Sequence, residues 1–295
     1  MSAKIKRVRL TNLAALFALV FGVAAAEAAE CGPDRLGTSR IVEVGAQGGL
    51  SVGLKTYPKT IRLADHEVIL TFDDGPDSST TPLVLEALAR ECARATFFDI
   101  GRKAEAIPDL VHREAAEGHT VAHHTYSHPQ PTMRGMSARE ARADILRGMI
   151  AVEKAAYGLD FSAGAPADLA ALKPRTPFFR FPGFADTADL KQWFAANNIG
   201  IFGTDIWASD WLQMTPQAEL KLILSRLEKA RRGMILLHDD KPWTAQMLPD
   251  FLSELKKRGY RIVHMIPGPG PGITADAPPG WVSETGRTLE KGEQR

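Results

Sequence analysis

Residues 68–76 read VILTFDDGP, and the fold prediction starts from this stretch. Its first five residues form an apolar and β-branched run without a charge, which is typical of a strand buried on both faces. Two aspartates, Asp73 and Asp74, follow this run, and a Gly-Pro pair then turns the chain. A few residues later, Thr81 directly before Pro82 predicts a capped helix with proline at its first position. The stretch therefore predicts a buried strand, a polar loop and a helix in succession.

The same alternation continues along the chain. Further strands are predicted over residues 95–100, 119–124, 178–181, 199–204, 234–237 and 260–265. Helices are predicted between them over residues 108–117, 138–156, 190–194, 216–232 and 247–257. The third of these six helices, counting the one at Thr81, opens with a capping box of Ser137 and Glu140.

Seven strands, each except the last followed by a helix, predict an α/β fold with a parallel sheet. A (β/α) barrel with catalytic groups at the carboxyl ends of its strands is the natural candidate. An open doubly wound sheet would show the same alternation and remains the alternative.

Polar side chains gather where the predicted strands end. Asp73 and Asp74 end the first strand, and His124 and His128 stand four residues apart at the end of the third. Two imidazoles and one carboxylate leave open positions on a metal ion, as catalytic sites do, and zinc suits these ligands. Taken singly, these motifs also fit an aspartate-rich turn or a buried core histidine. His238 ends the sixth strand, and its place beside the other groups favours a catalytic role.

Five ordered motifs carry a resemblance to a known family. They are TFDDGP at 71–76, HTYSHP at 124–129, RFPG at 180–183, DW at 210–211 and LLH at 236–238. The set closely resembles the motifs of the polysaccharide deacetylases, the family-four carbohydrate esterases related to the nodulation chitooligosaccharide deacetylase. The resemblance spans residues 66–266. It implies a distorted seven-stranded (β/α) barrel, a divalent metal and hydrolysis of acetyl groups from sugars.

The resemblance also implies roles for the first two motifs. Asp73 would be the general base, and Asp74, His124 and His128 would bind a divalent metal. The metal expected is Zn²⁺, with Co²⁺ or another divalent ion as alternatives. Such an ion lowers the pKa of water and polarises the acetyl carbonyl, while Asp73 takes the proton of the attacking water. Arg180 would hold Asp73 in place.

The remaining motifs imply the other parts of the site. His238 would be the general acid that protonates the departing amine, and Asp210 would support it. The Gly183 N–H would face the tetrahedral oxyanion. Trp211 and Leu236 would wall a pocket for the acetyl methyl group.

Three positions depart from the family pattern. His123 stands where an asparagine usually precedes the first histidine ligand, so it would either compete for the metal or tune it. Trp207 replaces an aspartate that is common in the fourth motif, and Gly183 replaces the usual aromatic residue after the proline. These departures bear on the fit of the substrate, because every proposed ligand, base and acid is present.

Three functions are compared on this basis. The first is a metal-dependent deacetylase that acts on an N-acetylated glycan such as a chitooligosaccharide, peptidoglycan or an exopolysaccharide. The second is an esterase that cleaves O-acetyl groups, as on acetylxylan, because the same groups serve both reactions. The third is a non-catalytic glycan-binding homologue, which should lack one of Asp73, Asp74 or His238, and the chain lacks none of them.

The composition and the N-terminus indicate an exported globular protein. With 44% hydrophobic and 24% charged residues, the 295-residue chain is neither collagen-like nor wholly disordered, and it is not a polytopic membrane protein. Residues 1–29 combine early basic residues, an apolar run over 13–26 and small residues, which predicts a cleaved signal peptide. A retained signal anchor is the alternative. We expect a periplasmic or secreted protein without a stable membrane anchor.

The remaining segments are predicted as follows. Removal of residues 1–29 leaves a net charge of −2, so no nucleic-acid partner is expected and the predicted partner is an acetylated glycan. Residues 30–65 are predicted to be an irregular covering segment, 66–266 the catalytic domain, and 267–295 a Pro/Gly-rich disordered tail. Cys31 and Cys92 are the only cysteines and would be able to pair in an oxidising compartment.

Overall fold

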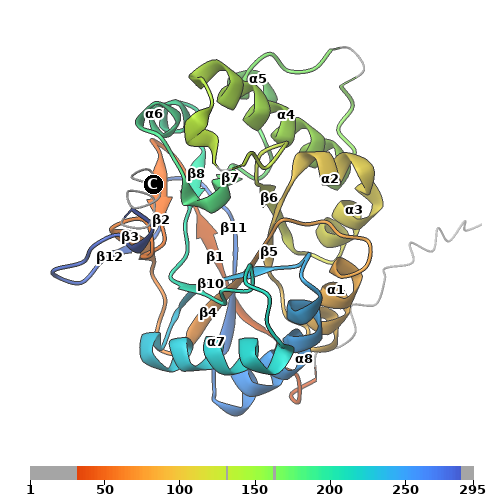
Figure 1. Ribbon diagram of the computed structural model, residues 1–295, viewed down its shortest axis with the longest axis vertical. Helices are drawn as coiled ribbons and strands as arrows, with labels where there is room; N and C mark the ends of the chain where they lie inside the picture. Colours follow the sequence, from red (N-terminus) through yellow and green to blue (C-terminus); the bar gives the residue numbers. More distant parts are fainter. Residues whose placement is uncertain (1–31, 131, 162–163, 287–295) are drawn as a thin grey trace, which may run out of the picture. The chain divides into compact units, whose positions relative to one another are not determined.

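Ten strands, all paired in parallel, form the central sheet (Figure 1). The computed structural model describes residues 32–130, 132–161 and 164–286. Within them the sheet contains β1 (Thr38–Val44), β2 (Leu50–Val52), β4 (Glu67–Asp73), β5 (Thr96–Asp99), β6 (Thr120–His123), β7 (Phe178–Phe179), β8 (Gly200–Phe202), β9 (Ile206–Trp207), β10 (Gly233–His238) and β11 (Arg261–Pro267). The strand order is β1-β11-β4-β5-β6-β7-β8-β2, and β10 pairs with both β4 and β9. The predicted α/β class is confirmed, and all seven predicted strands are present.

The sheet curls around an apolar core of its own. One buried cluster collects residues from every strand of this sheet except β9, among them Ile69, Phe98 and Phe202. The neighbours of Ile69 along β4, Val68 and Leu70, belong to a second cluster that packs against the helices outside the sheet. Because successive side chains of a strand point to opposite faces, this alternation separates a barrel interior from an outer layer. The predicted distorted barrel is therefore confirmed, although among the described residues its sheet has ten strands in place of seven, because β1, β2 and β9 join it.

The helices surround this sheet. They are α1 (Thr81–Arg90), α2 (Gly101–Ala106), α3 (Pro108–Ala116), α4 (Ala138–Tyr157), α5 (Leu169–Leu172), α6 (Ala188–Ala196), α7 (Pro216–Ala230) and α8 (Pro242–Lys257), with 3₁₀ turns η1 (Met133–Gly135) and η2 (Pro182–Phe184). The capping box at the start of α4 is present as predicted, since Ser137 accepts from the Glu140 N–H and the Glu140 carboxylate accepts in return. Helix α7 ends at Ala230 because Arg231 takes a left-handed conformation, earlier than the predicted stop at Gly233.

The segment before residue 66 is more regular than the sequence predicts. Strand β1 pairs with β11, and β2 pairs with β8, so both extend the parallel sheet. A third short strand, β3 (Lys59–Ile61), pairs with β12 (Thr274–Asp276) in a separate antiparallel ribbon. The prediction of an irregular covering over 30–65 is thus corrected. Strands β2 and β3 have only three residues each, and β1 has mostly exposed side chains. The partners of all three strands lie at least 150 residues away in the chain, as Gly200 does from Leu50, so local pattern does not reveal them.

Residues 267–286 have defined partners, which corrects the prediction of disorder for this part of the C-terminal segment. Strand β12 pairs with β3, and the Trp281 indole N–H donates to the Leu54 carbonyl at 2.6 Å. The Pro/Gly content suggested disorder, but Gly268, Ala277, Glu284 and Thr285 also donate backbone hydrogen bonds to distant carbonyl oxygens, so partners elsewhere in the chain hold the segment. Residues 287–295 lie outside the described part of the chain.

Several expectations fall on or near the undescribed N-terminus. The predicted signal peptide over 1–29 and Cys31 lie outside the described residues. Cys92 is disulfide-bonded, and Cys31 is the only other cysteine of the chain. The pairing of the two stays a prediction. In the residues that the structure does describe, none of the helices has the length and apolar character needed to span a membrane.

Candidate active site

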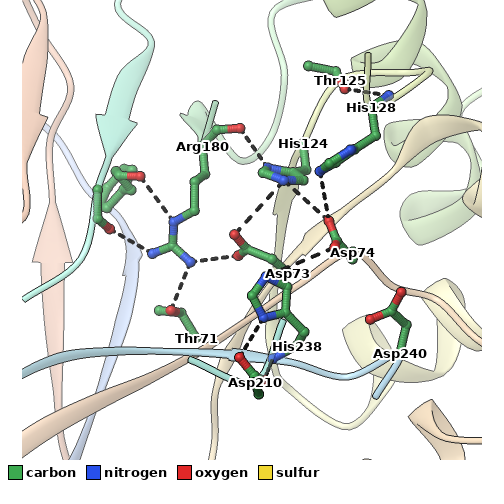
Figure 2. A network of polar contacts seen from close by, with 12 residues as sticks. Thr71, Asp73, Asp74, His124, Thr125, His128, Arg180, Asp210, His238 and Asp240 are labelled. Carbon is green, nitrogen blue, oxygen red and sulfur yellow. Dashed lines mark hydrogen bonds and ion pairs between the residues drawn. The ribbon is translucent and has the colours of Figure 1, made fainter. Parts of the chain in front are cut away.

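Polar side chains from several strands meet at the carboxyl edge of the sheet (Figure 2). Asp73 ends β4 and His238 ends β10, and the two residues are register partners in the parallel pair. His124 follows β6, and Arg180 follows β7 directly. Because parallel strands all finish at the same edge, residues distant in the sequence become neighbours here.

Asp74, His124 and His128 form a compact group of potential metal ligands. The Asp74 Oδ1 atom lies 3.4 Å from His124 Nε2 and 3.2 Å from His128 Nε2. One ligand atom from each residue lies within 4.8 Å of the others. Donor atoms bound at about 2.0–2.1 Å to a tetrahedral zinc ion lie roughly 3.3 Å apart, so the two shorter separations match edges of such a site.

The chemistry of these donors also fits a cation. Asp74 Oδ1 is buried and accepts no hydrogen bond, which leaves a carboxylate oxygen that a bound cation would satisfy. His124 Nδ1 lies 2.7 Å from the Arg180 carbonyl oxygen, which can only accept. His124 Nδ1 therefore carries a proton, and the other ring nitrogen, Nε2, faces Asp74. This arrangement is the one that a metal-binding histidine adopts.

The backbone around the ligands is shaped to present them. Asp74 takes a left-handed conformation with φ of 72°, which separates its carboxylate from that of the preceding Asp73. Burial raises the pKa of Asp74, but the imidazoles of His124 and His128 outweigh this effect and hold the pKa well below its usual range. The carboxylate of Asp74 is therefore ionised at neutral pH.

Lys103 is a site residue that sequence reasoning missed. Its Nζ donates to the Asp74 carbonyl oxygen at 2.5 Å and to Asp240 Oδ2 at 3.2 Å. Lys103 lies in helix α2, which the sequence did not predict, and it is 29 residues from Asp74. No motif or spacing indicates this contact, because the turn after β4 and the helix after β5 meet only in the folded chain.

Arg180 fixes the position of Asp73. The Arg180 side chain is fully buried, and one of its Nη atoms donates to Asp73 Oδ1 at 2.6 Å. Its remaining donors bind Thr71 Oγ1 and the carbonyl oxygens of Phe202 and Gly203. Burial lowers the pKa of Arg180, and Asp73 opposes this shift. The second carboxylate oxygen of Asp73, Oδ2, lies 3.9 Å from His124 Nε2 and so borders the ligand group.

His238 is oriented by Asp210. The Nδ1 atom of His238 lies 2.8 Å from Asp210 Oδ1, and the His238 backbone N–H donates to Asp210 Oδ2 at 2.6 Å. Thr244 donates a further hydrogen bond to Asp210 Oδ2. Burial lowers the pKa of His238, but Asp210, Asp74 and Asp73 outweigh it and raise the pKa to about 10. His238 is therefore a protonated imidazolium at neutral pH, and its Nε2 lies 4.0 Å from Asp74 Oδ2.

These groups open into a cavity of about 330 Å³. Its other walls are largely aromatic and apolar, and they include the predicted Gly183, Trp211 and Leu236. The cavity also contacts four residues that the sequence did not assign to a wall, namely Phe181, Phe184, Trp207 and Thr285. The edge of the sheet thus joins two neighbouring aspartates, an imidazolium and an apolar pocket.

His123 does not join the ligand group. Its Nε2 lies 3.0 Å from the Thr176 carbonyl oxygen and 3.4 Å from Glu153 Oε1, inside the packing between β6 and α4. Among the described residues, the group able to hold a metal consists of Asp74, His124 and His128 alone. Competition between His123 and His124 for a metal, one of the two expectations for this position, therefore has no support in the geometry.

Comparison with known proteins relates the chain to polysaccharide deacetylases. The family model for polysaccharide deacetylases matches residues 61–164. A peptidoglycan-N-acetylglucosamine deacetylase of Listeria monocytogenes is 29% identical over 220 residues, which is 72% of this chain and 42% of that protein. A chitooligosaccharide deacetylase of Bradyrhizobium is 30% identical over 215 residues, which is 68% of this chain and 89% of that protein.

The chain is also similar in fold to a solved deacetylase structure. The peptidoglycan deacetylase of Bdellovibrio bacteriovorus superposes with a TM-score of 0.65 at 28% identity, over 78% of this chain and 59% of that one. The chain therefore spans less than two thirds of the length of the Listeria and Bdellovibrio proteins, and most of the length of the Bradyrhizobium protein.

Proposed function

Because the chain belongs to the polysaccharide deacetylase family, we propose that it hydrolyses the acetamide of an N-acetylated glycan and releases acetate. The main support for this proposal is the grouping of the polar side chains around one cavity. Asp73, His238 and the group of Asp74, His124 and His128 surround a single cavity whose remaining walls suit an acetyl group. A glycan-binding protein without catalysis has no need for a buried base and a charged acid on either side of one pocket.

In this proposal Asp74, His124 and His128 hold a divalent ion, which we take to be Zn²⁺. Neutral imidazole nitrogens and a carboxylate are ligands that zinc prefers, and three protein ligands leave a position open for reactants. Co²⁺ or another divalent ion is the alternative. When bound, the ion supplies Lewis acidity, because it lowers the pKa of water and polarises the acetyl carbonyl.

Asp73 acts as the general base. Arg180 binds its Oδ1 and leaves Oδ2 at the cavity, where it takes the proton of the water that attacks the acetyl carbon. Gly183 lines the cavity with its backbone exposed, and its N–H supports the negative charge on the tetrahedral oxygen.

His238 acts as the general acid. Asp210 stabilises the imidazolium and orients it, so that Nε2 donates its proton to the departing amine nitrogen. An amine leaves poorly without a proton, so this transfer matters more for an acetamide than for an acetate ester. Trp211 and Leu236 enclose the methyl group of the acetyl unit.

The experiment is an acetate-release assay on chitooligosaccharides, peptidoglycan and acetylxylan, with the protein loaded with zinc and after chelation. We expect release from an N-acetylated glycan that chelation abolishes. The Asp73→Asn variant should keep its metal and lose turnover, whereas His124→Ala should lose both. Full activity of a preparation shown by elemental analysis to be metal-free would refute the site assignment.

The same assay separates the amide and ester reactions. General acid catalysis contributes about 10²–10⁴-fold, so His238→Ala should reduce N-deacetylation by roughly that factor and hydrolysis of an activated aryl acetate much less. Equal losses on both substrates would count against His238 as the acid. Wild-type activity on acetylxylan alone would establish the O-acetyl esterase instead.

We also propose that the enzyme is exported to the periplasm or secreted, because residues 1–29 have the layout of a signal peptide. Cleavage is expected between Ala26 and Ala29. Mass spectrometry of the mature N-terminus tests this, and an intact Met1 or Ser2 in the exported fraction would contradict it.

A further inference from the structure

The cavity extends beyond the groups that would hold an acetyl unit. From His238 the wall continues to the ring of Trp211, whose centroid lies 6.2 Å from that of the imidazole. Trp207 follows, with its ring centroid 5.6 Å from Trp211 in an edge-on arrangement, and Phe184 lies 6.4 Å further on. An acetamide fills only part of about 330 Å³, so this aromatic wall borders space that another part of the substrate would occupy.

Trp207 is held in place by a loop and by the C-terminal segment. The Nζ atom of Lys55 lies 4.9 Å from the centroid of the Trp207 ring, which is a cation–π contact. The Lys55 backbone N–H donates to the Thr204 carbonyl oxygen, which anchors the loop near Trp207.

Residues 281–286, which we call the strap, contact this loop. The backbone N–H groups of Glu284 and Thr285 both donate to the Lys55 carbonyl oxygen, at 3.0 and 3.1 Å. Thr285 is buried and lines the cavity. The strap therefore binds the loop that supports the wall with Trp207.

The ammonium group of Lys55, which lies over the Trp207 ring, is already paired. Lys55 Nζ forms a 2.5 Å ion pair with Glu284 Oε1, so the cation over Trp207 is neutralised by the strap. The Thr285 hydroxyl donates to the Lys55 carbonyl oxygen, so its proton is also used within the protein. The wall consequently offers an apolar ring, which suits an uncharged sugar ring with a face of C–H bonds.

We propose that Trp207, positioned by Lys55 and the strap, binds the neutral sugar unit next to the one that is deacetylated. This inference rests on the proposed function and names the part of the substrate that the site recognises. Trp207 would then determine specificity for chain length, since an oligomer has a neighbouring sugar to place on this ring and a single N-acetylated sugar has none.

The test compares N-acetylglucosamine with its β-1,4-linked tetramer as substrates. The wild type should prefer the tetramer in kcat/KM, and Trp207→Ala should lose about tenfold more activity on the tetramer than on the single sugar, mainly through KM. Trp207→Phe should recover much of this preference. Trp193→Ala is the matched control, because Trp193 is also half-buried but packs on Phe194 in α6, away from the cavity.

Binding provides a second readout that does not require turnover. In the Asp73→Asn background, calorimetric titration should give tighter binding of the tetramer than of the single sugar, and both Trp207→Ala and Lys55→Met should reduce the difference. Equal effects of Trp207→Ala on the two ligands, or a wild type without length preference in either readout, would overturn the inference. If Trp207→Ala does not fold, Trp207→Phe and Lys55→Met decide the question by the same two measurements. A wild type that releases no acetate but still prefers the tetramer in binding would refute the proposed function and retain this subsite.

Discussion

At the scale of single residues, the contact of Lys103 with the Asp74 backbone leads to a prediction about metal affinity. Asp74 holds a left-handed conformation, which is uncommon outside glycine although aspartate adopts it more readily than most residues, and the Lys103 ammonium binds its carbonyl oxygen. Loss of an outer partner of a metal ligand typically weakens binding by about 10–100-fold. Lys103→Met should therefore weaken zinc binding by roughly tenfold, measured by titration of the metal-free protein against a chromophoric chelator.

Two variants control this measurement. Lys103→Arg preserves the positive charge and should retain most of the affinity. Lys241→Met removes the other ammonium beside Asp240 and should have a smaller effect, since Lys241 binds Asp240 Oδ1 from a different side. Equal zinc affinity of Lys103→Met and the wild type would show that the contact does not hold the ligand.

The ion pair of Arg180 and Asp73 is the second case at this scale. Both side chains are almost wholly buried, at 0% and 4% exposure. Removing one partner leaves an unpaired buried charge, which costs about 3–5 kcal/mol. We expect Arg180→Met to lower the free energy of unfolding in urea by about this amount, and Arg180→Met with Asp73→Asn to be less destabilised than the sum of the two single variants. Strict additivity would contradict the importance of the pair.

At the scale of elements, helix α4 packs directly against the loop that carries the two histidine ligands. Gly148 makes this approach possible, because a Cβ atom added there would lie 2.4 Å from the Thr125 carbonyl carbon and 2.6 Å from Tyr126 N. Alanine in place of glycine favours a helix by about 1 kcal/mol, but overpacking against backbone costs typically 1–3 kcal/mol. The loop and the helix would have to separate.

We therefore expect Gly148→Ala to lower the melting temperature and to weaken zinc binding, since the displaced loop holds His124 and His128. Gly135→Ala is the matched control, because a Cβ at Gly135 would meet no atom within 4 Å. A Gly148→Ala protein as stable as the wild type, with unchanged zinc affinity, would refute the coupling between α4 and the ligand loop.

At the scale of the whole molecule, two buried histidines away from the ligand group predict how stability depends on pH. Burial, with repulsion from His264 and nearby arginines, lowers the pKa of His119 to about 3, and burial with repulsion from Arg94 lowers the pKa of His264 to about 4. In the unfolded chain each would titrate near 6.5. Below that pH the unfolded state binds protons that the folded state does not, so each histidine reduces stability as the pH falls.

The difference is measurable with one variant. Between pH 7 and pH 5, the wild type should lose about 2 kcal/mol more unfolding free energy than His264→Gln, since each pH unit is worth about 1.4 kcal/mol per proton. Urea denaturation at the two pH values provides the measurement. The same loss in both proteins would mean that His264 is not held neutral in the fold.

The sequence by itself determined the repeated part of the fold and most of the candidate site. Buried strands such as β4 were visible because continuous apolar runs are local, and the start of α4 was visible because Ser137 and Glu140 cap it within one turn. Because these strands are parallel, the proximity of Asp73, His124 and His238 could also be predicted from the sequence. Residues at the carboxyl ends of parallel strands meet at one edge of the sheet, and this does not depend on the conformation of the connecting loops.

Only the tertiary structure decided what lies around these groups. Several features depend on partners that are distant in the sequence. They are strands β1, β2 and β12, the strap beside Lys55, and the hydrogen bond from Lys103 to Asp74. The tertiary structure also decided that His123 faces Glu153 and that Trp207 faces the cavity. The hydrophobic pattern of the sequence did not predict these features, because short strands, single charges and side-chain directions produce no periodic signal. Their free energy comes from contacts that exist only after the chain has folded.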